Sequence, residues 1–298
     1  MFSYKSAIIN EKTFISLTSL TVSEFKDLCK TFSQQWEKYT NQESRDPKSG
    51  GRPPSLKTIE DRLFFILYYL KTYPLQEVIA YSFGISQGTA NVLIHQLSHI
   101  LKLTLSELGY VPARITEDMI KRLQLEETQP YVIDGTERPI VRPSNKVVQR
   151  TFYSGKKKHH TIKNNLIAGI NDRQIKHLGG THEGKKHDKK IAEEEHLELP
   201  AGSDIYRDTG FQGLEMEGVN IYQPKKKPNG KELTDEEKYN NRLISRVRVV
   251  VEHVISGVKR CHIVSDIFRN TKSGYDDLVL ELSSALHNFR SHSRLAFY

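Results

Sequence analysis

Three carboxylates, Asp134, Asp208 and Glu252, have neighbours that suit an acidic active site. Asp134 and Asp208 each follow a short apolar run typical of a strand, and a glycine within two residues of each lets another segment approach closely. Carboxylates that lie close together repel one another, so such a cluster makes sense chiefly where a cation neutralises it. Ligands that are all oxygen favour Mg²⁺ or Mn²⁺ over zinc. The chemistry expected here is therefore that of a hard divalent metal ion.

Glu252 stands within residues 246–260, a stretch that has the pattern of an amphipathic helix. At about 100° per residue, Arg248, Glu252 and Lys259 fall on nearly one line. The neighbouring stripe is apolar and consists of Val247, Val250, Val251, Val254 and Val258. One face is thus expected to pack while the other presents an acid between two bases. A plain surface ion pair between Arg248 and Glu252 is the alternative.

The elements that would position these acids form an α/β pattern after about residue 126. Strands are expected over residues 131–133, 147–153, 161–170, 174–178, 204–206 and 220–223, and helices over 189–195, from Thr234 to the Glu252 region, and over 275–289. Thr234 to Glu237 has the spacing of a helix capping box. Antiparallel strands followed by βα crossovers are the layout of a ribonuclease-H-like domain, which would bring strand-end acids and a helix acid together.

Two further polar segments of this half are candidates for binding. Residues 142–163 contain several Lys and Arg and no acid, and Lys156, Lys157 and Lys158 stand at the expected hairpin tip. This hairpin is the best candidate for gripping phosphates, with a solvated loop as the alternative. The segment around His187 and Asp188 also has metal-ligand residue types, but on its own this signal is weak because such residues are common in polar loops.

The first half of the chain is expected to be helical. Helical spacing runs from about Ser23, and again over residues 56–70, 75–83 and 87–103. Ala80 and Gly84 have the spacing that a helix-turn-helix needs between its two helices. That unit would expose side chains able to bond base edges or phosphates, namely Ser86, Gln87, Thr89, Asn91 and His95. An ordinary three-helix bundle is the alternative, and residues 41–54 read as a linker or a basic arm with Arg45, Lys48 and Arg52.

Composition favours a protein that meets an anionic partner inside the cell. Lys and Arg number 44 against 36 Asp and Glu, so the net charge is +8 and nucleic acid is the favoured partner. Only two cysteines occur among 298 residues, which argues against a disulfide framework or a thiolate zinc site. The longest apolar run, Leu63 to Leu70, is far below the roughly 20 residues that span a bilayer, and no signal peptide is evident. We expect no membrane association.

Several stretches together resemble the DDE transposases of the insertion-sequence-five and Harbinger branch. They are residues 134–140, 153–159, 187–188, 208–213 and 248–259, and the resemblance covers roughly residues 131–288, with a helix-turn-helix of the expected kind at 56–99. The resemblance implies that Asp134, Asp208 and Glu252 are the metal ligands. The family signature of Tyr, two residues, Arg, three residues, Glu, six residues and Lys is met by Arg248, Glu252 and Lys259, but Ser245 stands at the Tyr position. Asp188 is either an additional ligand or a group that supports one.

The resemblance implies cleavage of double-stranded DNA at the terminal inverted repeats of a mobile element and joining of its 3′-hydroxyl ends to target DNA. Two Mg²⁺ or Mn²⁺ ions per active site would serve this chemistry, with no covalent enzyme intermediate. Joining two ends implies a dimer or larger assembly on DNA, in a bacterial cytoplasm, or in the nucleus if the host is eukaryotic. Arg248 and Lys259 would hold phosphates. A DNA-binding regulator and an endonuclease without strand transfer are the alternatives.

The expected architecture has three parts. Residues 1–50 form a helical segment with a basic linker, residues 51–110 a helix-turn-helix domain, and residues 126–298 a ribonuclease-H-like α/β catalytic domain. Length is consistent with more than one unit, since domains most often run about 100 to 150 residues.

Overall fold

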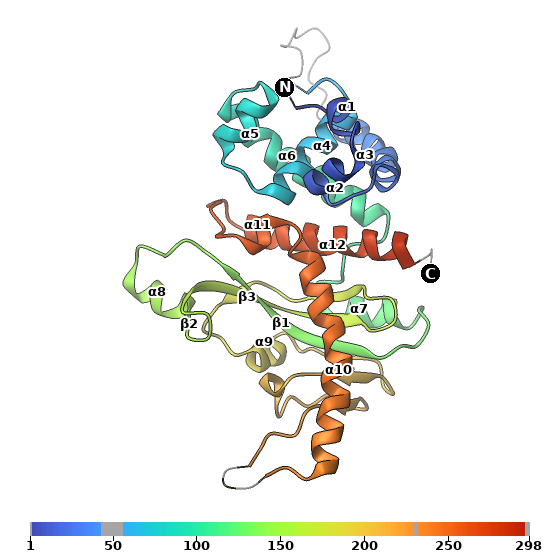
Figure 1. The fold of residues 1–298 in the computed structure, drawn as a ribbon, viewed down its shortest axis with the longest axis vertical. Helices are drawn as coiled ribbons and strands as arrows, with labels where there is room; N and C mark the ends of the chain where they lie inside the picture. Colours follow the sequence, from blue (N-terminus) through green and yellow to red (C-terminus); the bar gives the residue numbers. More distant parts are fainter. Residues whose placement is uncertain (1, 43–55, 229, 231, 296–298) are drawn as a thin grey trace. The chain divides into compact units, whose positions relative to one another are not determined.

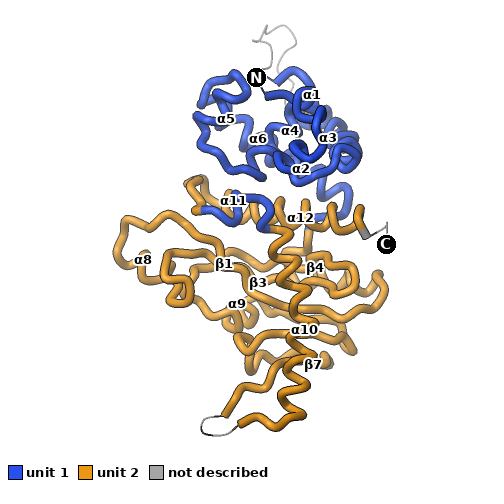
Figure 2. The backbone as a smooth tube through the Cα atoms, in the orientation of Figure 1, with its two compact units in different colours: residues 1–111, 259–266 blue, residues 112–258, 267–298 orange. Residues whose placement is uncertain are grey.

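The computed structural model describes residues 2–42, 56–228, 230 and 232–295. Its contacts divide the chain into two compact units (Figure 2), one of residues 1–111 and 259–266 and the other of residues 112–258 and 267–298. The expected linker positions Arg45, Lys48 and Arg52, and the expected boundary between residues 50 and 51, lie outside the described residues. The segment before that linker is grouped with the helices that follow it.

The first unit is all α-helical (Figure 1). Its described helices are α1 (Tyr4–Ala7), α2 (Glu11–Thr18), α3 (Val22–Gln42), α4 (Ile59–Thr72), α5 (Gln76–Phe83), α6 (Gln87–Glu107) and α11 (His262–Ser265). Helix α4 is buried all round from Arg62 to Leu70, as expected of a helix at the centre of a bundle. Helices α2, α3, α6 and α11 pack against it. The helices predicted from residue 23 and over residues 56–70, 75–83 and 87–103 are therefore confirmed.

The turn between α5 and α6 has the geometry that its residues indicate. Gly84 ends α5 with a φ of 66°, the left-handed conformation that glycine adopts without strain. Ala80 is buried, and α5 packs against α6. The Ser86 hydroxyl accepts a hydrogen bond from the Thr89 amide at 3.1 Å and so caps α6.

Helix α11 belongs to this first unit although it follows the longest helix of the second (Figure 2). It packs against α4 and buries Cys261, Ile263 and Val264. Lys71 of α4 donates a hydrogen bond to the carbonyl of Arg260 at 2.8 Å. The late segment 259–266 thus completes the core around α4.

The second unit is built on a mixed sheet. Its strands are β1 (Tyr131–Pro139), β2 (Tyr153–Ser154), β3 (His159–Gly169), β4 (Ile175–Leu178), β5 (His182–Glu183), β6 (Asp204–Tyr206) and β7 (Asn220–Tyr222). The order is β2-β3-β1-β6-β7, with β4 and β5 also paired to β3. Strand β3 is antiparallel to β1 and β4, while β6 is parallel to β1 and β7.

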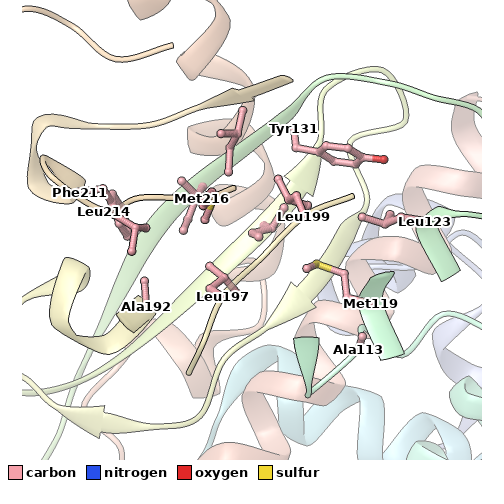
Figure 3. Packing of buried hydrophobic residues seen from close by; sticks show 13 residues of the cluster. Ala113, Met119, Leu123, Tyr131, Ala192, Leu197, Leu199, Phe211, Leu214 and Met216 are labelled. Atoms are coloured by element: carbon pink, nitrogen blue, oxygen red, sulfur yellow. The ribbon is translucent and has the colours of Figure 1, made fainter. Parts of the chain in front are cut away.

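Helices cover this sheet. They are α7 (Thr116–Leu123), α8 (Lys146–Phe152), α9 (Asp188–Glu194), α10 (Asp235–Val258) and α12 (Tyr275–Leu295), with a 3₁₀ turn η1 at Thr209–Phe211. One face of the sheet carries the core cluster of Figure 3, in which Tyr131 and Ile133 of β1 pack with residues of α7, α9 and the 197–216 segment. Side chains alternate along a strand, so Val132 and Asp134 point to the other face. Helix α10 packs against β1 and β6.

The predicted fold class is confirmed, an all-α unit followed by a ribonuclease-H-like α/β unit. The capping box at Thr234 is present, because the Thr234 amide donates to Glu237 and the Glu237 amide donates back to the Thr234 hydroxyl. The predicted strand over residues 147–153 is wrong: residues 146–152 form α8. Asn145 accepts hydrogen bonds from the amides of Val147 and Val148, and this cap outweighs the strand preference of two valines that remain exposed.

Strand β1 also runs further than its apolar residues indicate. It continues past Asp134 to Pro139, because every residue from Tyr131 to Pro139 pairs with β3. Its pairing with β6 is limited to Tyr131 and Val132. Asp134 therefore lies inside a strand but just beyond the parallel part of the sheet.

His177 of β4 is expected to make the protein acid-sensitive. It is buried, neither ring nitrogen has a hydrogen-bond partner among the described residues, and burial, with Arg114 nearby, lowers its pKa from 6.5 to about 4. The neutral ring is thus favoured in the folded state, so this contribution to stability is present above pH 6.5 and is lost as the pH falls toward 4. We expect the free energy of unfolding to fall by about 3 kcal/mol more in the native protein than in His177→Leu between about pH 7 and pH 4. Urea unfolding at both pH values measures this, and equal losses would contradict it.

Candidate active site

Asp134 and Asp208 lie side by side in register. The parallel strands pair Val132 with Tyr206, and each aspartate follows its strand's paired residue by two positions. Continuing that register brings the two side chains to the same edge and the same face of the sheet. Each carboxylate accepts a hydrogen bond from the amide of the next residue, at 2.8 Å for Asp134 and 2.7 Å for Asp208.

Helix α10 contributes a cation to this pair. Arg248 Nη1 lies 3.3 Å from Asp208 Oδ1, and its side chain is only 17% exposed. Its charge also favours the ionised form of Asp134. The alternative ion pair between Arg248 and Glu252 is absent from the described residues, where the carboxylate that pairs with Arg248 is that of Asp208.

Asp188, at the start of α9, comes close to both aspartate segments. A Cβ at Gly135 would lie 2.9 Å from the Asp188 carboxylate carbon, and one at Gly210 would lie 3.7 Å from its Oδ2. A side chain at position 135 would therefore push Asp188 away. Lys163 holds the other oxygen, with Nζ 3.1 Å from Asp188 Oδ1.

The surroundings of Asp134 disfavour its ionised form, chiefly because the side chain is buried. Burial raises its pKa, and the charges of Asp208 and Asp188 raise it further, against the opposing effects of the Gly135 amide and Arg248. These neighbouring oxygen ligands have the donor chemistry that a hard divalent cation requires. Among the described residues, however, no three His, Cys, Asp or Glu side chains are grouped closely enough to hold a metal ion. The acids fit a divalent cation in kind, but the ligand shell is open.

Glu252 is not joined to this cluster by any described interaction. It lies on α10 one turn after Arg248, and its side chain is exposed. Because α10 packs against β1 and β6, the helix that carries Glu252 is the one that brings Arg248 to Asp208.

The predicted position of Lys259 on the same helix is wrong. Helix α10 ends at Val258, and Lys259 begins the turn that leads to α11 in the first unit. The residues that follow belong to the first unit, where Cys261, Ile263 and Val264 are buried.

The predicted DNA-contact residues are mostly accessible. Lys156, Lys157 and Lys158 are exposed in the turn between β2 and β3, so the hairpin tip is present although its first strand is only Tyr153–Ser154. Ser86 and Gln87 are exposed at the start of α6, and Thr89 and Asn91 are half-buried. The side-chain amides of Gln87 and Asn91 donate hydrogen bonds to Gln76 Oε1 of α5, at 2.6 and 3.3 Å.

Lys163 is the residue of this region that sequence reasoning missed. Its ammonium group lies 3.4 Å from Glu137 and 3.1 Å from Asp188, and the Lys163 side chain is 12% exposed. Glu137 and Lys163 face each other because β1 and β3 pair in that register. A register between strands separated by more than 20 residues has no local signature, although alternation within residues 161–170 placed Lys163 on the face of Asn165 and Ile167.

Both halves of the chain are similar to known proteins. A family model described as "DDE superfamily endonuclease" matches residues 133–288, and one described as "Helix-turn-helix of DDE superfamily endonuclease" matches residues 54–107. A protein of Microchaete diplosiphon described as "Probable transposase for insertion sequence element IS702" is 30% identical over 255 residues, which cover 84% of this chain and 88% of that protein. No solved structure matches the chain. Of the helices that the structure describes, none has the length and apolar character needed to span a membrane.

Proposed function

This chain belongs to the DDE superfamily endonucleases, and on that premise we propose that it is a DNA transposase of the insertion-sequence-five and Harbinger branch. It cleaves DNA at the ends of an insertion sequence and joins the resulting 3′-hydroxyl ends to target DNA. The observation that carries the proposal is the shared register of Asp134 and Asp208 beyond Val132 and Tyr206, with Arg248 beside them. Endonucleases of the DDE superfamily generally depend on divalent metal ions.

Asp134 and Asp208 are the proposed ligands for Mg²⁺ or Mn²⁺, with Glu252 completing the shell. Two such ions, when bound, would activate the attacking water or 3′-hydroxyl and stabilise the leaving 3′-oxygen. The raised pKa of Asp134 means that its carboxylate is poorly compensated by the protein alone. Asp188, held by Lys163, is either a further ligand or a group that positions the part of β1 that carries Asp134.

The basic residues divide the DNA contacts between them. We propose that Arg248 holds a phosphate at the acids, and we assign the same role to Lys259 without the support of a shared helix face. The turn of Lys156, Lys157 and Lys158 contacts the backbone further out. Ser86, Gln87, Thr89 and Asn91 at the start of α6 contact duplex DNA in the terminal inverted repeat, as the second helix of a helix-turn-helix does.

The assembly follows from the reaction. Joining two element ends requires two active sites, so we propose a dimer or larger complex on DNA, in the cytoplasm of a bacterium. Within one chain, we propose residues 51–110 as the DNA-binding domain, residues 126–298 as the catalytic domain, and residues 1–50 as the segment before them, although segment 259–266 packs in the first unit.

Cleavage of DNA that carries the element's own ends tests the proposal. With Mg²⁺ or Mn²⁺, the native protein should cut at the element boundary, while Glu252→Gln should bind the same DNA but lose cutting by on the order of 10³-fold or more. Glu198→Gln, an exposed glutamate outside this site, is the matched control and should cut normally. Binding without cutting by the native protein in either metal would instead favour a DNA-binding regulator.

A further inference from the structure

A basic pocket lies beside α8, at the base of the turn between β2 and β3. Its volume is about 810 Å³, within the range of pockets that hold small ligands. Its charged and aromatic lining consists of Arg142, Lys146, Arg150, Tyr153, His160 and Lys185. No Asp or Glu that the structure describes lines the pocket, so it is separate from the carboxylates described above.

Four cations of this pocket, Arg142, Lys146, Arg150 and Lys185, form no ion pair with any acid that the structure describes. Neighbouring lysines behave differently, since Lys163 pairs with Glu137 and Asp188, and Lys186 pairs with Glu194. Four uncompensated positive charges around one hollow favour an anionic ligand with more than one charged group. A run of phosphodiesters has that character.

The pocket also offers an aromatic surface. Tyr153 is 44% exposed, and its ring meets His160 edge to face, with centroids 5.6 Å apart and planes at 71°. The ring is thus supported on one side while it lines the pocket. Aromatic side chains beside a basic groove are how proteins hold unpaired nucleotides, because a base can stack on a ring only when its face is free.

The pocket is connected to the acids by one short segment. Lys185 lines it and stands three residues before Asp188. The Lys185 amide donates to the carbonyl of Thr151 in α8 at 3.2 Å. Lys163 Nζ lies 3.1 Å from both the Lys186 carbonyl and Asp188 Oδ1. A DNA strand held in the pocket would therefore lie close to Asp188.

We propose that this pocket binds an unpaired stretch of DNA strand, with its phosphates on Arg142, Lys146, Arg150 and Lys185 and a base stacked on Tyr153. The inference rests on the proposed transposase function and deepens it, since it assigns a second DNA site that takes single strands rather than duplex. The lysine turn 156–158 lies outside the pocket lining and can contact duplex as well as single strands.

Binding of two fluorescent probes to the full-length protein tests this assignment. One probe is oligothymidylate of about 12 nucleotides, long enough for a single-strand site, and the other is a duplex of the element end. Tyr153→Leu should weaken oligothymidylate binding on the order of 10-fold, Tyr153→Phe should retain it, and both should bind duplex normally. Lys146→Ala/Arg150→Ala should weaken oligothymidylate binding and reduce its salt dependence, whereas Lys190→Ala/Lys226→Ala, an equal loss of exposed charge, should have a small effect.

Each other outcome overturns the assignment. Equal oligothymidylate binding by Tyr153→Leu and Tyr153→Phe would remove the stacking role, and an equal loss for duplex and single strand would make the pocket a general backbone contact. Equal losses of oligothymidylate binding in Lys146→Ala/Arg150→Ala and Lys190→Ala/Lys226→Ala would show that the pocket is not the binding site. Cleavage of element ends by the native protein is measured alongside, so that failure of the proposed function is seen separately, as absent cutting.

Discussion

Replacing Asp134 by Asn should abolish DNA cleavage and at the same time make the metal-free protein more stable. Burial and the charges of Asp208 and Asp188 raise the pKa of Asp134 in the folded state. A raised pKa favours the protonated form on folding, so this contribution to stability is present below the unfolded-state pKa and is lost as the pH rises through the folded-state value. Asn cannot ionise, and its carbonyl can still accept the Gly135 amide, so at neutral pH the variant avoids that loss.

Three measurements check the two effects together. Cleavage of element-end DNA should fall by on the order of 10³-fold or more, while the Tm of the metal-free variant should exceed that of the native protein. Added Mg²⁺ should raise the Tm of the native protein by binding the folded state alone, and should raise that of Asp134→Asn much less. Asp204→Asn is the control, because Asp204 lies on the strand that precedes Asp208 and its carboxylate accepts from Asn220 instead. A variant that cuts DNA, or that melts below the native protein without metal, would refute this role for Asp134.

The largest loss of stability is expected from Arg138→Met. Arg138 is 1% exposed, and its guanidinium donates to the Asp276 carbonyl at 2.6 Å, to Asn164 at 3.0 Å and to Thr181 at 3.2 Å. Burial lowers its pKa to about 10, and Asp276 and Asp277 oppose that shift, so the group stays charged at neutral pH. Methionine fills a similar volume but leaves these buried acceptors without their donor.

The expected cost of Arg138→Met is about 3 to 5 kcal/mol in the free energy of unfolding, as for one partner removed from a buried charged network. Arg150→Met, at an exposed position, should change it by less than about 0.5 kcal/mol. Urea titration of both variants at neutral pH gives the comparison. Similar midpoints for the two would mean that the Arg138 network adds nothing over an apolar side chain.

Local signals explain which elements were predictable from the sequence. The helices around Gly84 could be placed because the positive φ of that residue and the Ser86 cap are properties of single positions. Asp134 and Asp208 stood out because each follows a buried apolar run. Helix α8 was missed because Val147 and Val148 favour strands, while the competing cap at Asn145 is a single side chain.

The remaining features depend on contacts between distant residues. Lys163 reaches Asp188 only because β3 pairs with β1 in one register and α9 begins at its edge. Helical periodicity places Arg248 and Glu252 on one face, but it carries no information about which strand that face meets or where the helix ends. The partner of Arg248 therefore proved to be Asp208 rather than Glu252, and Lys259 fell outside the helix.

The segment 259–266 has a consequence for how the two units can be separated. The chain passes from one unit to the other after residues 111, 258 and 266, so a single cut releases neither unit with all of its parts. A fragment ending at residue 111 would lack Ile263 and Val264, which are buried in the first unit, and would expose apolar surface on α4. The first unit, which contains the proposed DNA-binding domain, is therefore not a detachable module. Exchanging it for that of a relative would require transplanting two separate pieces of sequence together.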